Sequence, residues 1–388
     1  MSTIRVTNIE HESTANGGIQ LDSSGHVTVD GQQMPTAGAL SNRNLVIGGA
    51  MNIAQRGTST TVAAADGDTF LVDRFFVLID GTAAATYSQS TEAPADFSRS
   101  IKLDVTTADT LNTNDQLKLE HRVEGYNSAF LNWGTSDAKK VTLSFWIKSN
   151  LTGNTQVAFV NNGNNRNYVA TFTIDSANTW EQKTLTVPGD TAGTWETGNG
   201  IGIRLRWGSF GPTYQTSSVD QWVANSTQLN SRSDSPINFA SSTDNELYIT
   251  GVQLEVGEKA TPFEHRSYSD ELARCQRYFL DPAGVSGDAS GTDFIQFNLG
   301  QTGTGSNEYI VPVSFPVTMR VAPTVTVGSN DKGEGVFNTL NPNGNGRLDA
   351  TTSGTKSIGT TGCSLKCRDN SDSSHSGFRG WFYADAEL

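Results

Sequence analysis

Short runs rich in Val, Ile, Thr and Phe alternate along the chain with clusters of Gly, Asn, Ser and Asp, at intervals of about 8–12 residues. This spacing is typical of an all-β sandwich or barrel. The clearest predicted strands are 69–78, 100–106 and 140–149. Further candidates lie at 155–160, 168–174, 182–187, 201–207, 247–255, 292–299 and 324–327. The pattern therefore predicts an all-β fold.

The segment 141–149 shows which faces of its strand are buried. Val141, Leu143, Phe145 and Ile147 share one face, because side chains alternate across a strand. Trp146 then falls on the opposite face. We expect both faces of this strand to be partly covered.

Residues 1–40 have a different pattern. Two short extended pieces, GIQLD and HVTVDG, flank the turn 22–25. The segment has too little apolar surface to fold alone. We expect it to pair with another copy of itself or with a docking partner.

One segment, HRSYSDELARCQRYFL, predicts a helix. Ser267 followed three residues later by Asp270 fits a capping box. One apolar stripe runs along this helix and consists of Tyr268, Leu272, Cys275 and Phe279. Packing against the core is the simplest explanation, and a threefold helix bundle at a subunit axis is the alternative. A tract of Gly, Ser and Asp follows Pro282, so a domain boundary is expected near this residue.

Composition narrows the function classes. The 388 residues are 35% hydrophobic and 17% charged, with a net charge of −13, and Ser, Thr, Asn and Gln make up roughly a third. Such an acidic chain is a poor nucleic-acid binder, because phosphate binding needs clustered Lys and Arg. No stretch approaches the length of a membrane span, and the start MSTIRVTNIEHES has no apolar signal region. Three cysteines exclude a disulfide scaffold.

Catalytic motifs are scarce. His11, His26, His121, His265 and His375 show no metal-ligand spacing, and no GxSxG, P-loop or dinucleotide fingerprint occurs. Four carboxylates flank aromatic or loop positions and are candidates for a glycosidase pair: Glu181, Glu196, Asp220 and Asp234. Solvated loop acids are the simpler interpretation, so we expect no enzyme.

Two acidic turns are candidates for a structural calcium ion, although no cofactor is required. Their ligands would be Asp66 and Asp68 in the first turn, and Asp244 and Glu246 in the second. Hydrated turn residues are the alternative interpretation. Cys363 and Cys367 would lie about 13 Å apart on a strand, too far for a disulfide. We expect both to be reduced.

Aromatic residues concentrate in 207–222, a segment with little predicted strand. Exposed aromatic rings stack on the C–H faces of sugars, and amide side chains bond the hydroxyls. We therefore predict glycan binding by Phe210, Tyr214 and Trp222, helped by Asn164 and Tyr168 around the polar loop Asn161–Asn167. The alternative is that Trp207 and Trp222 pack under the loop as its own small core.

Several segments resemble bacteriophage tail-fibre proteins that have a jelly-roll domain similar to carbohydrate-binding modules. They are 44–57, 72–75, 141–149 and above all 249–279, with FPVTMRVAP at 315–323 and ADAEL at the end. The N-terminal GGIQLDSSGHVTVDGQQMP is similar to the virion-attachment end of fibres from marine and cyanobacterial phages.

The resemblance implies a homotrimeric fibre, assembled in the host cytoplasm and extracellular after release, that binds host-surface glycan. Residues 1–40 would attach it to a tail or head adaptor protein. A jelly roll at 41–266, a connecting helix at 267–281 and a β-domain at 282–388 would follow. The alternatives are a structural virion joint or decoration protein, and a polysaccharide depolymerase. Three copies of −13 approach about −39, so an anionic polysaccharide would need bridging cations or a local basic patch.

Overall fold

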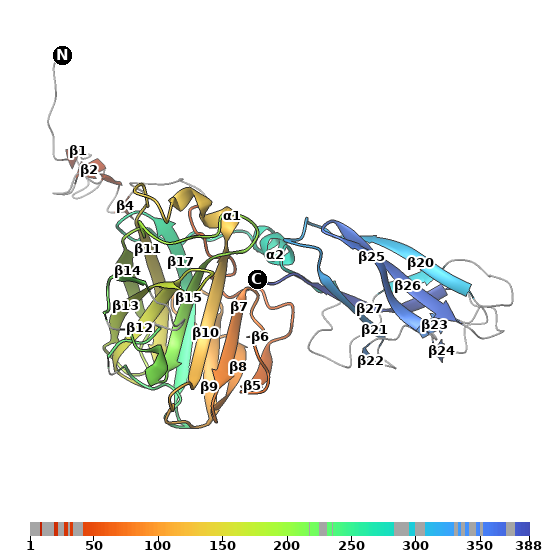
Figure 1. Cartoon of the computed structure of the whole chain (residues 1–388), viewed down its shortest axis with the longest axis horizontal. Coiled ribbons are helices and arrows are strands. Elements are labelled where there is room, and N and C mark those ends of the chain that lie inside the picture. The colour runs from red at the N-terminus through yellow and green to blue at the C-terminus, as the bar shows by residue number, and fades with distance from the viewer. Residues whose placement is uncertain are drawn as a thin grey trace, which may run out of the picture.

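The computed structural model describes residues 42–216, 218–224, 231–234, 236–282, 307–329, 352–369 and 377–388, with short strands at 8–9, 19–21, 27–29, 32–33, 295–298, 333–334, 338–340 and 347–349. Antiparallel sheets dominate it (Figure 1). The predicted all-β architecture, with a jelly-roll sandwich, a short helix and a C-terminal β-domain, is confirmed. No helix in the described part of the chain is long and apolar enough to cross a membrane.

The jelly roll consists of two sheets packed face to face. The seven-stranded sheet has the order β16 (Trp222–Ala224), β13 (Arg166–Ile174), β12 (Gly153–Val160), β15 (Ile201–Phe210), β10 (Gln116–Glu124), β7 (Phe75–Asp80) and β6 (Thr69–Phe70). The six-stranded sheet has the order β14 (Glu181–Val187), β11 (Val141–Ser149), β17 (Glu246–Val256), β9 (Ser100–Thr107), β8 (Ala84–Ser90) and β5 (Ser59–Ala63).

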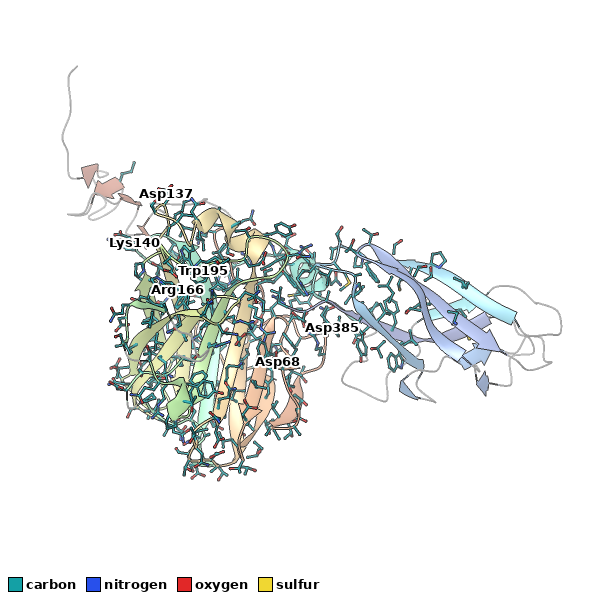
Figure 2. All side chains as sticks on the ribbon, in the orientation of Figure 1. Asp68, Asp137, Lys140, Arg166, Trp195 and Asp385 are labelled. Carbon is teal, nitrogen blue, oxygen red and sulfur yellow. The ribbon has the colours of Figure 1, made fainter. Side chains whose placement is uncertain are left out.

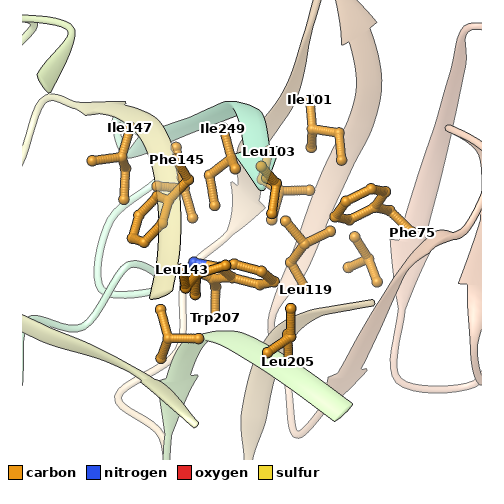
Figure 3. Close-up of a cluster of buried hydrophobic side chains, with 14 of the residues drawn as sticks. Phe75, Ile101, Leu103, Leu119, Leu143, Phe145, Ile147, Leu205, Trp207 and Ile249 are labelled. Atoms are coloured by element: carbon orange, nitrogen blue, oxygen red, sulfur yellow. The ribbon is translucent and has the colours of Figure 1, made fainter. Parts of the chain in front are cut away.

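The inward faces of both sheets form one apolar core (Figure 3). Phe145 from β11 and Trp207 from β15 meet there edge to face, with ring centroids 5.8 Å apart. Leu119 and Leu205 fill the same layer and are fully buried. The alternation predicted for 141–149 is thus confirmed, because Val141, Leu143, Phe145 and Ile147 are all buried.

Several strands differ from the sequence-based expectation, and β5 and β8 are among those that were not predicted. The predicted strand 69–78 is broken into β6 and β7, because Arg74 adopts a left-handed conformation with φ of 72°. Strand β10 was not predicted, although its residues alternate between apolar and charged. Its apolar side chains, such as Leu119, face the core, and its charged ones, such as Glu120, lie on the outer face.

Helix α2 (Tyr268–Gln276) begins as predicted, since the Ser267 hydroxyl accepts a hydrogen bond from the Asp270 amide. The helix ends before Phe279, which instead belongs to strand β18 (Phe279–Leu280). Cys275 and Phe279 are buried, whereas Tyr268 is 64% exposed. Leu272 is partly buried and packs against the cluster that contains Cys275. The stripe is therefore core packing except at Tyr268. Two further short helices, α1 (Gly125–Ser128) and η1 (Ala129–Leu131), follow β10 directly.

The C-terminal β-domain has two sheets. One contains β22 (Gly333–Glu334), β21 (Thr324–Ser329), β27 (Gly377–Asp385), β23 (Asn338–Leu340) and β24 (Arg347–Asp349), with β18 and β19 (Ile295–Asn298) also paired to β27. The other contains β20 (Asn307–Ser314), β26 (Gly362–Asp369) and β25 (Thr352–Gly359). Cys363 and Cys367 lie on β26 as buried thiols, as the strand spacing predicted.

Four short strands near the N-terminus form a sheet of their own: β1 (Asn8–Ile9), β2 (Ile19–Leu21), β3 (Val27–Val29) and β4 (Gln32–Gln33). Strands β2 and β3 fall in the two extended pieces expected from the sequence, and they pair antiparallel. The remaining residues of 1–40 lie outside the described residues, as do His11, His26 and His375.

The end of the chain returns to the jelly roll, and Figure 1 shows the C-terminus beside β7 and α2. Arg74, only 2% exposed, forms an ion pair with Glu387, donates to the Arg122 carbonyl at 2.7 Å, and stacks 3.5 Å from the Tyr278 ring. Arg320, in the C-terminal β-domain, donates to the Asn199 carbonyl of the jelly roll at 2.8 Å. Buried ion pairs and backbone acceptors therefore join the two β-domains.

His121, on β10, makes folding stability depend on pH. Burial and the neighbouring Arg74 lower the pKa of His121 to about 3, from its ordinary value of 6.5. The unfolded chain therefore takes up a proton below pH 6.5 while the folded chain does not. Proton uptake by His121 in the unfolded chain therefore leaves the folded state unaffected well above pH 6.5. It destabilises the folded state progressively as the pH falls from 6.5 toward 3.

We expect the free energy of unfolding to fall by about 2 kcal/mol from this source between pH 6.5 and about pH 5. His121→Gln retains a donor for the Ile47 carbonyl, which Nε2 contacts at 3.1 Å, but cannot be protonated. Urea unfolding across this pH range should show a flatter slope for the variant. The exposed His265→Gln is the control; equal slopes for His121→Gln and the wild type would contradict the assignment.

Candidate functional site: an aromatic cavity at one end of the sandwich

A cavity of about 150 Å³ lies at the end of the jelly roll where β10 runs into α1 and η1. Its second wall comes from the segment 188–200, which joins β14 to β15. The lining residues are Ser128, Ala129, Leu131, Asn132, Trp133, Thr135, Trp195, Glu196, Thr197 and Ile203. Figure 2 shows Trp195 and Arg166 toward this end, on the same side as Asp137 and Lys140.

Three tryptophans form a compact cluster at this cavity. The ring centroid of Trp133 lies 4.7 Å from that of Trp195 and 5.2 Å from that of Trp222, both edge to face. Trp195 and Trp222 are 5.4 Å apart, and Tyr168 lies 5.4 Å behind Trp222. Edge-to-face contacts of this kind stabilise the mutual orientation of the rings.

Hydrogen bonds fix the same orientation. The indole N–H of Trp133 donates to the Lys139 carbonyl at 2.8 Å, that of Trp195 to Ala192 at 3.2 Å and that of Trp222 to Pro188 at 2.7 Å. All three indole donors are thus satisfied by backbone oxygens. What Trp133 and Trp195 offer to the cavity is apolar ring surface.

An ion pair holds the second wall in place. Arg166 contacts both carboxylate oxygens of Asp190, at 2.7 and 2.5 Å, and the Asp190 side chain is 1% exposed. The Asp190 carbonyl accepts from the Gly134 amide at 2.7 Å, which ties the two walls together. Gly193 must be glycine here, because its φ is 80° and a Cβ would lie 2.5 Å from Arg166 Cγ.

Polar groups surround the rings. Glu196 Oε1 accepts from the Gly198 amide at 2.7 Å, which sets the direction of this carboxylate. Asn132 is exposed, and among the described residues nothing bonds its side-chain amide. The hydroxyls of Ser128, Thr135 and Thr197 complete the lining. The cavity thus presents apolar rings together with hydroxyl, amide and carboxylate groups.

The residues predicted to bind glycan are placed differently. Three of them are buried: Phe210 is 2% exposed, Tyr214 6% and Tyr168 6%. Their assignment as sugar-stacking residues assumed exposed rings, and the structure contradicts that assumption. The reason is that the loop folds onto itself: the Tyr214 ring lies 5.6 Å from Phe210, and its hydroxyl donates to the Asn114 carbonyl at 3.2 Å. Trp222 supports the cavity from behind, and Asn164 accepts from Arg206 at 2.9 Å.

The alternative interpretation, that Trp207 and Trp222 pack under the loop as a small core of its own, is confirmed in part. Both side chains are packed, but Trp207 lies in the sandwich core and Trp222 in the tryptophan cluster. Three residues of the site were not predicted from the sequence: Trp133, Trp195 and Asn132. Their signal was the occurrence of tryptophan inside the turn-rich stretches NWGTSD and GTWETGNG, where no strand was predicted.

The four candidate acids do not meet in one place. Glu196 is the only carboxylate among the residues lining the cavity. Glu181 lies in the other sheet; burial favours a higher pKa, but Lys183 and the amides of Asp175 and Ser176 outweigh it and lower the pKa of Glu181. Asp220 accepts from Thr171, and Asp234 contacts Gln215.

The candidate calcium ligands are engaged by protein groups. Asp66 accepts from the Ala63 amide at 2.7 Å, and Asp68 contacts Arg122 at 2.7 Å. Glu246 pairs with Lys102 at 2.6 Å, and Asp244 accepts from a serine hydroxyl. In the part of the chain that the structure describes, no three His, Cys, Asp or Glu side chains are grouped to hold a metal ion. Calcium binding stays a prediction.

Comparisons with known proteins concern the jelly roll. No family model and no curated protein sequence matches the chain. A tailspike protein domain of bacteriophage CBA120 is 13% identical over 55% of this chain, with a TM-score of 0.30. The matching part spans 21% of that chain, about a fifth of its length.

Carbohydrate-binding modules are also similar. A family 11 module from Clostridium thermocellum, in complex with a mixed-linked tetrasaccharide, is 11% identical over 53% of this chain and 98% of its own, with a TM-score of 0.26. The xylan-binding domain CBM22-2 from Paenibacillus barcinonensis is 13% identical over 51% of this chain and 99% of its own, also with a TM-score of 0.26. Function is therefore inferred from the geometry of the site.

The Arg166–Asp190 pair can be tested directly. Asp190→Ala leaves a largely buried guanidinium without its partner, so we expect the free energy of unfolding to fall by about 3–5 kcal/mol. Chemical denaturation followed by tryptophan fluorescence measures this change. Asp137→Ala, at an exposed position in the loop after Trp133, is the control and should leave stability within about 0.5 kcal/mol. Equal stability of both variants would show that the pair does not hold the wall.

Proposed function

We propose that this protein is a trimeric phage fibre whose jelly roll binds host-surface glycan and whose residues 1–40 attach it to the virion. The observation that carries the proposal is the cavity at the end of the sandwich, where Trp133 and Trp195 stand edge to face beside Glu196 and Asn132. The resemblance of several segments to phage tail fibres supports the virion setting. In this role the protein is assembled in the host cytoplasm and acts outside the cell.

The chemistry of the cavity suits a sugar. A sugar ring has C–H faces that pack on aromatic surface and hydroxyls that need hydrogen-bond partners. The cavity volume of about 150 Å³ is below the roughly 300–1,000 Å³ of sites for drug-sized ligands. It therefore fits a single unit of a glycan chain. Binding at one such site is weak, and three linked copies strengthen attachment through avidity.

Binding without cleavage fits the cavity better than hydrolysis. Glycoside hydrolysis uses two carboxyl groups about 5–10 Å apart on opposite sides of the scissile bond. Glu196 is the only carboxylate among the lining residues, so it serves here as a hydrogen-bond acceptor for hydroxyls. Glu196→Gln should weaken binding, while neither the variant nor the wild type should release reducing ends from host polysaccharide.

Adsorption of the labelled full-length protein to host cells tests the proposal. Trp195→Ala removes one wall of the cavity, and we expect the affinity per site to drop about thirtyfold, the effect of losing a 2 kcal/mol hot spot. Trp146→Ala, a half-buried tryptophan on β11 of the other sheet, is the matched control and should adsorb normally. Periodate oxidation of surface sugars should abolish adsorption of the wild type.

Four results would contradict the proposal. Adsorption that survives periodate would indicate a protein receptor. Equal adsorption of Trp195→Ala and the wild type would exclude this cavity. A trimer by light scattering that binds no host cells would support the purely structural role as a virion joint or decoration protein, and a monomer would remove the fibre assignment altogether.

A further inference from the structure

A group of five charged side chains lies on the outer face of the seven-stranded sheet. Lys118, Glu120 and Arg122 come from alternate positions of β10, and Arg204 and Arg206 from β15. Glu120 is directly opposite Arg206 in the antiparallel register, and Arg122 is opposite Arg204. We call these five residues the β10–β15 charge cluster.

Glu120 is the centre of the cluster. One carboxylate oxygen is 2.7 Å from Arg122 and 3.0 Å from Arg204, and the other is 2.7 Å from Arg206 and 3.2 Å from Lys118. The Glu120 side chain is 0% exposed. One carboxylate is thus surrounded by four cations.

The positive charge of the cluster exceeds its negative charge. Arg122 has acceptors besides Glu120, because it lies 2.7 Å from Asp68 and also donates to an oxygen of Leu388. For Lys118, Arg204 and Arg206, Glu120 is the only paired carboxylate among the described residues, so three cations share one negative charge in a chain whose net charge is −13. The four cationic side chains are only 7–13% exposed. Uncompensated charge with so little access to water is destabilising unless a further anion approaches.

Donors for such an anion remain in the cluster. Arg204 Nε is buried and has no hydrogen-bond partner among the described residues. Arg206 uses one nitrogen for Glu120 and another for the Asn164 side chain. Burial, together with repulsion from Arg206, lowers the pKa of Lys118 despite the nearby Glu120. The cluster therefore behaves as a site with too many positive charges.

The cluster is continuous with the aromatic cavity. Strand β10 runs directly into α1, which lines the cavity, and β15 begins directly after the segment that bears Trp195 and Glu196. The loop 161–167 contacts both places: the Asn161 amide donates to the Thr194 carbonyl at 3.0 Å, and Asn164 accepts from Arg206. A chain of several sugars in the cavity can therefore extend toward the cluster.

We propose that the β10–β15 charge cluster binds an acidic substituent of the glycan, a carboxylate, sulfate or phosphate, so that the ligand is an anionic polysaccharide. This rests on the proposed function for the identity of the polymer. The bound anion supplies the missing negative charge beside Arg204, Arg206 and Lys118, while the tryptophan rings bind a neighbouring sugar unit. The cluster is the local basic patch that an acidic fibre needs in order to bind an acidic polymer.

Affinity electrophoresis of the full-length protein in gels containing a polysaccharide tests this inference. The probes are dextran sulfate, polygalacturonate and neutral dextran. Retardation is expected with either or both of the acidic polymers and not with dextran, and it should weaken with added salt because counterions compete for the cations. Comparison of the first two separates sulfate from carboxylate recognition.

Arg204→Gln should weaken the binding of the acidic polymer about tenfold, and Lys118→Gln similarly. Each variant leaves three cations around Glu120, and thermal unfolding shows whether the variant is folded. If one of the two variants does not fold, the binding result of the other tests the inference. Lys140→Gln makes the same change of charge at a side chain that is 54% exposed and paired with Glu258, and it should bind as the wild type does. No binding of the wild type to either acidic polymer, or equal binding of the cluster variants and the wild type, would overturn the inference.

The two proposals fail separately. If adsorption to host cells depends on Trp195 but not on Arg204, glycan binding stands and the anionic character of the ligand is wrong. If acidic polymers bind through Arg204 while host cells are not bound, the anion site stands and the receptor-binding function is wrong.

Discussion

The outer face of β10 carries the charged side chains on which the remaining structure depends. Glu120 collects four cations from β10 and β15, Arg122 reaches the Leu388 carbonyl at the end of the chain, and Glu124 accepts two hydrogen bonds from Arg277 and one from Tyr278. Side chains on one face of β10 thus bind to β15 of the same sheet, to the end of the chain at Leu388, and to Arg277 and Tyr278 just after α2. Because these groups are nearly buried, each carboxylate needs its cations and each cation its acceptors.

This arrangement has consequences for the candidate site. The strand that holds the charges leads directly into the helical turns that line the aromatic cavity, so the two proposed binding surfaces share one support. The indole N–H groups are all bonded to backbone oxygens, and the Arg166–Asp190 pair fixes the opposite wall. A preformed site loses little conformational entropy on binding, which matters most when each contact is weak.

The sequence predicted the strands whose apolar residues dominate, such as β11, and the helix whose cap is local, at Ser267. It did not predict β10, although the alternation of apolar and charged residues in this segment is the pattern of a half-buried strand. The site was missed for a different reason. Trp133 and Trp195 are distant in sequence and stand in turn-rich segments, whereas Phe210 and Tyr214 looked exposed because no neighbouring strand was visible to cover them.

By itself, the sequence determined the all-β class, the capped helix and the reduced state of Cys363 and Cys367, since these follow from local alternation, capping and spacing. The jelly-roll sandwich was predicted from the resemblance of several segments to a known family. The net charge of −13 also follows from the sequence, but the place where the cations gather does not. Only the tertiary structure decided which aromatic rings are buried, which form a cavity, and that four cations meet at Glu120. The reason is that burial and electrostatic pairing depend on contacts between strands far apart in the chain, and strand register, which no local pattern specifies, sets those contacts.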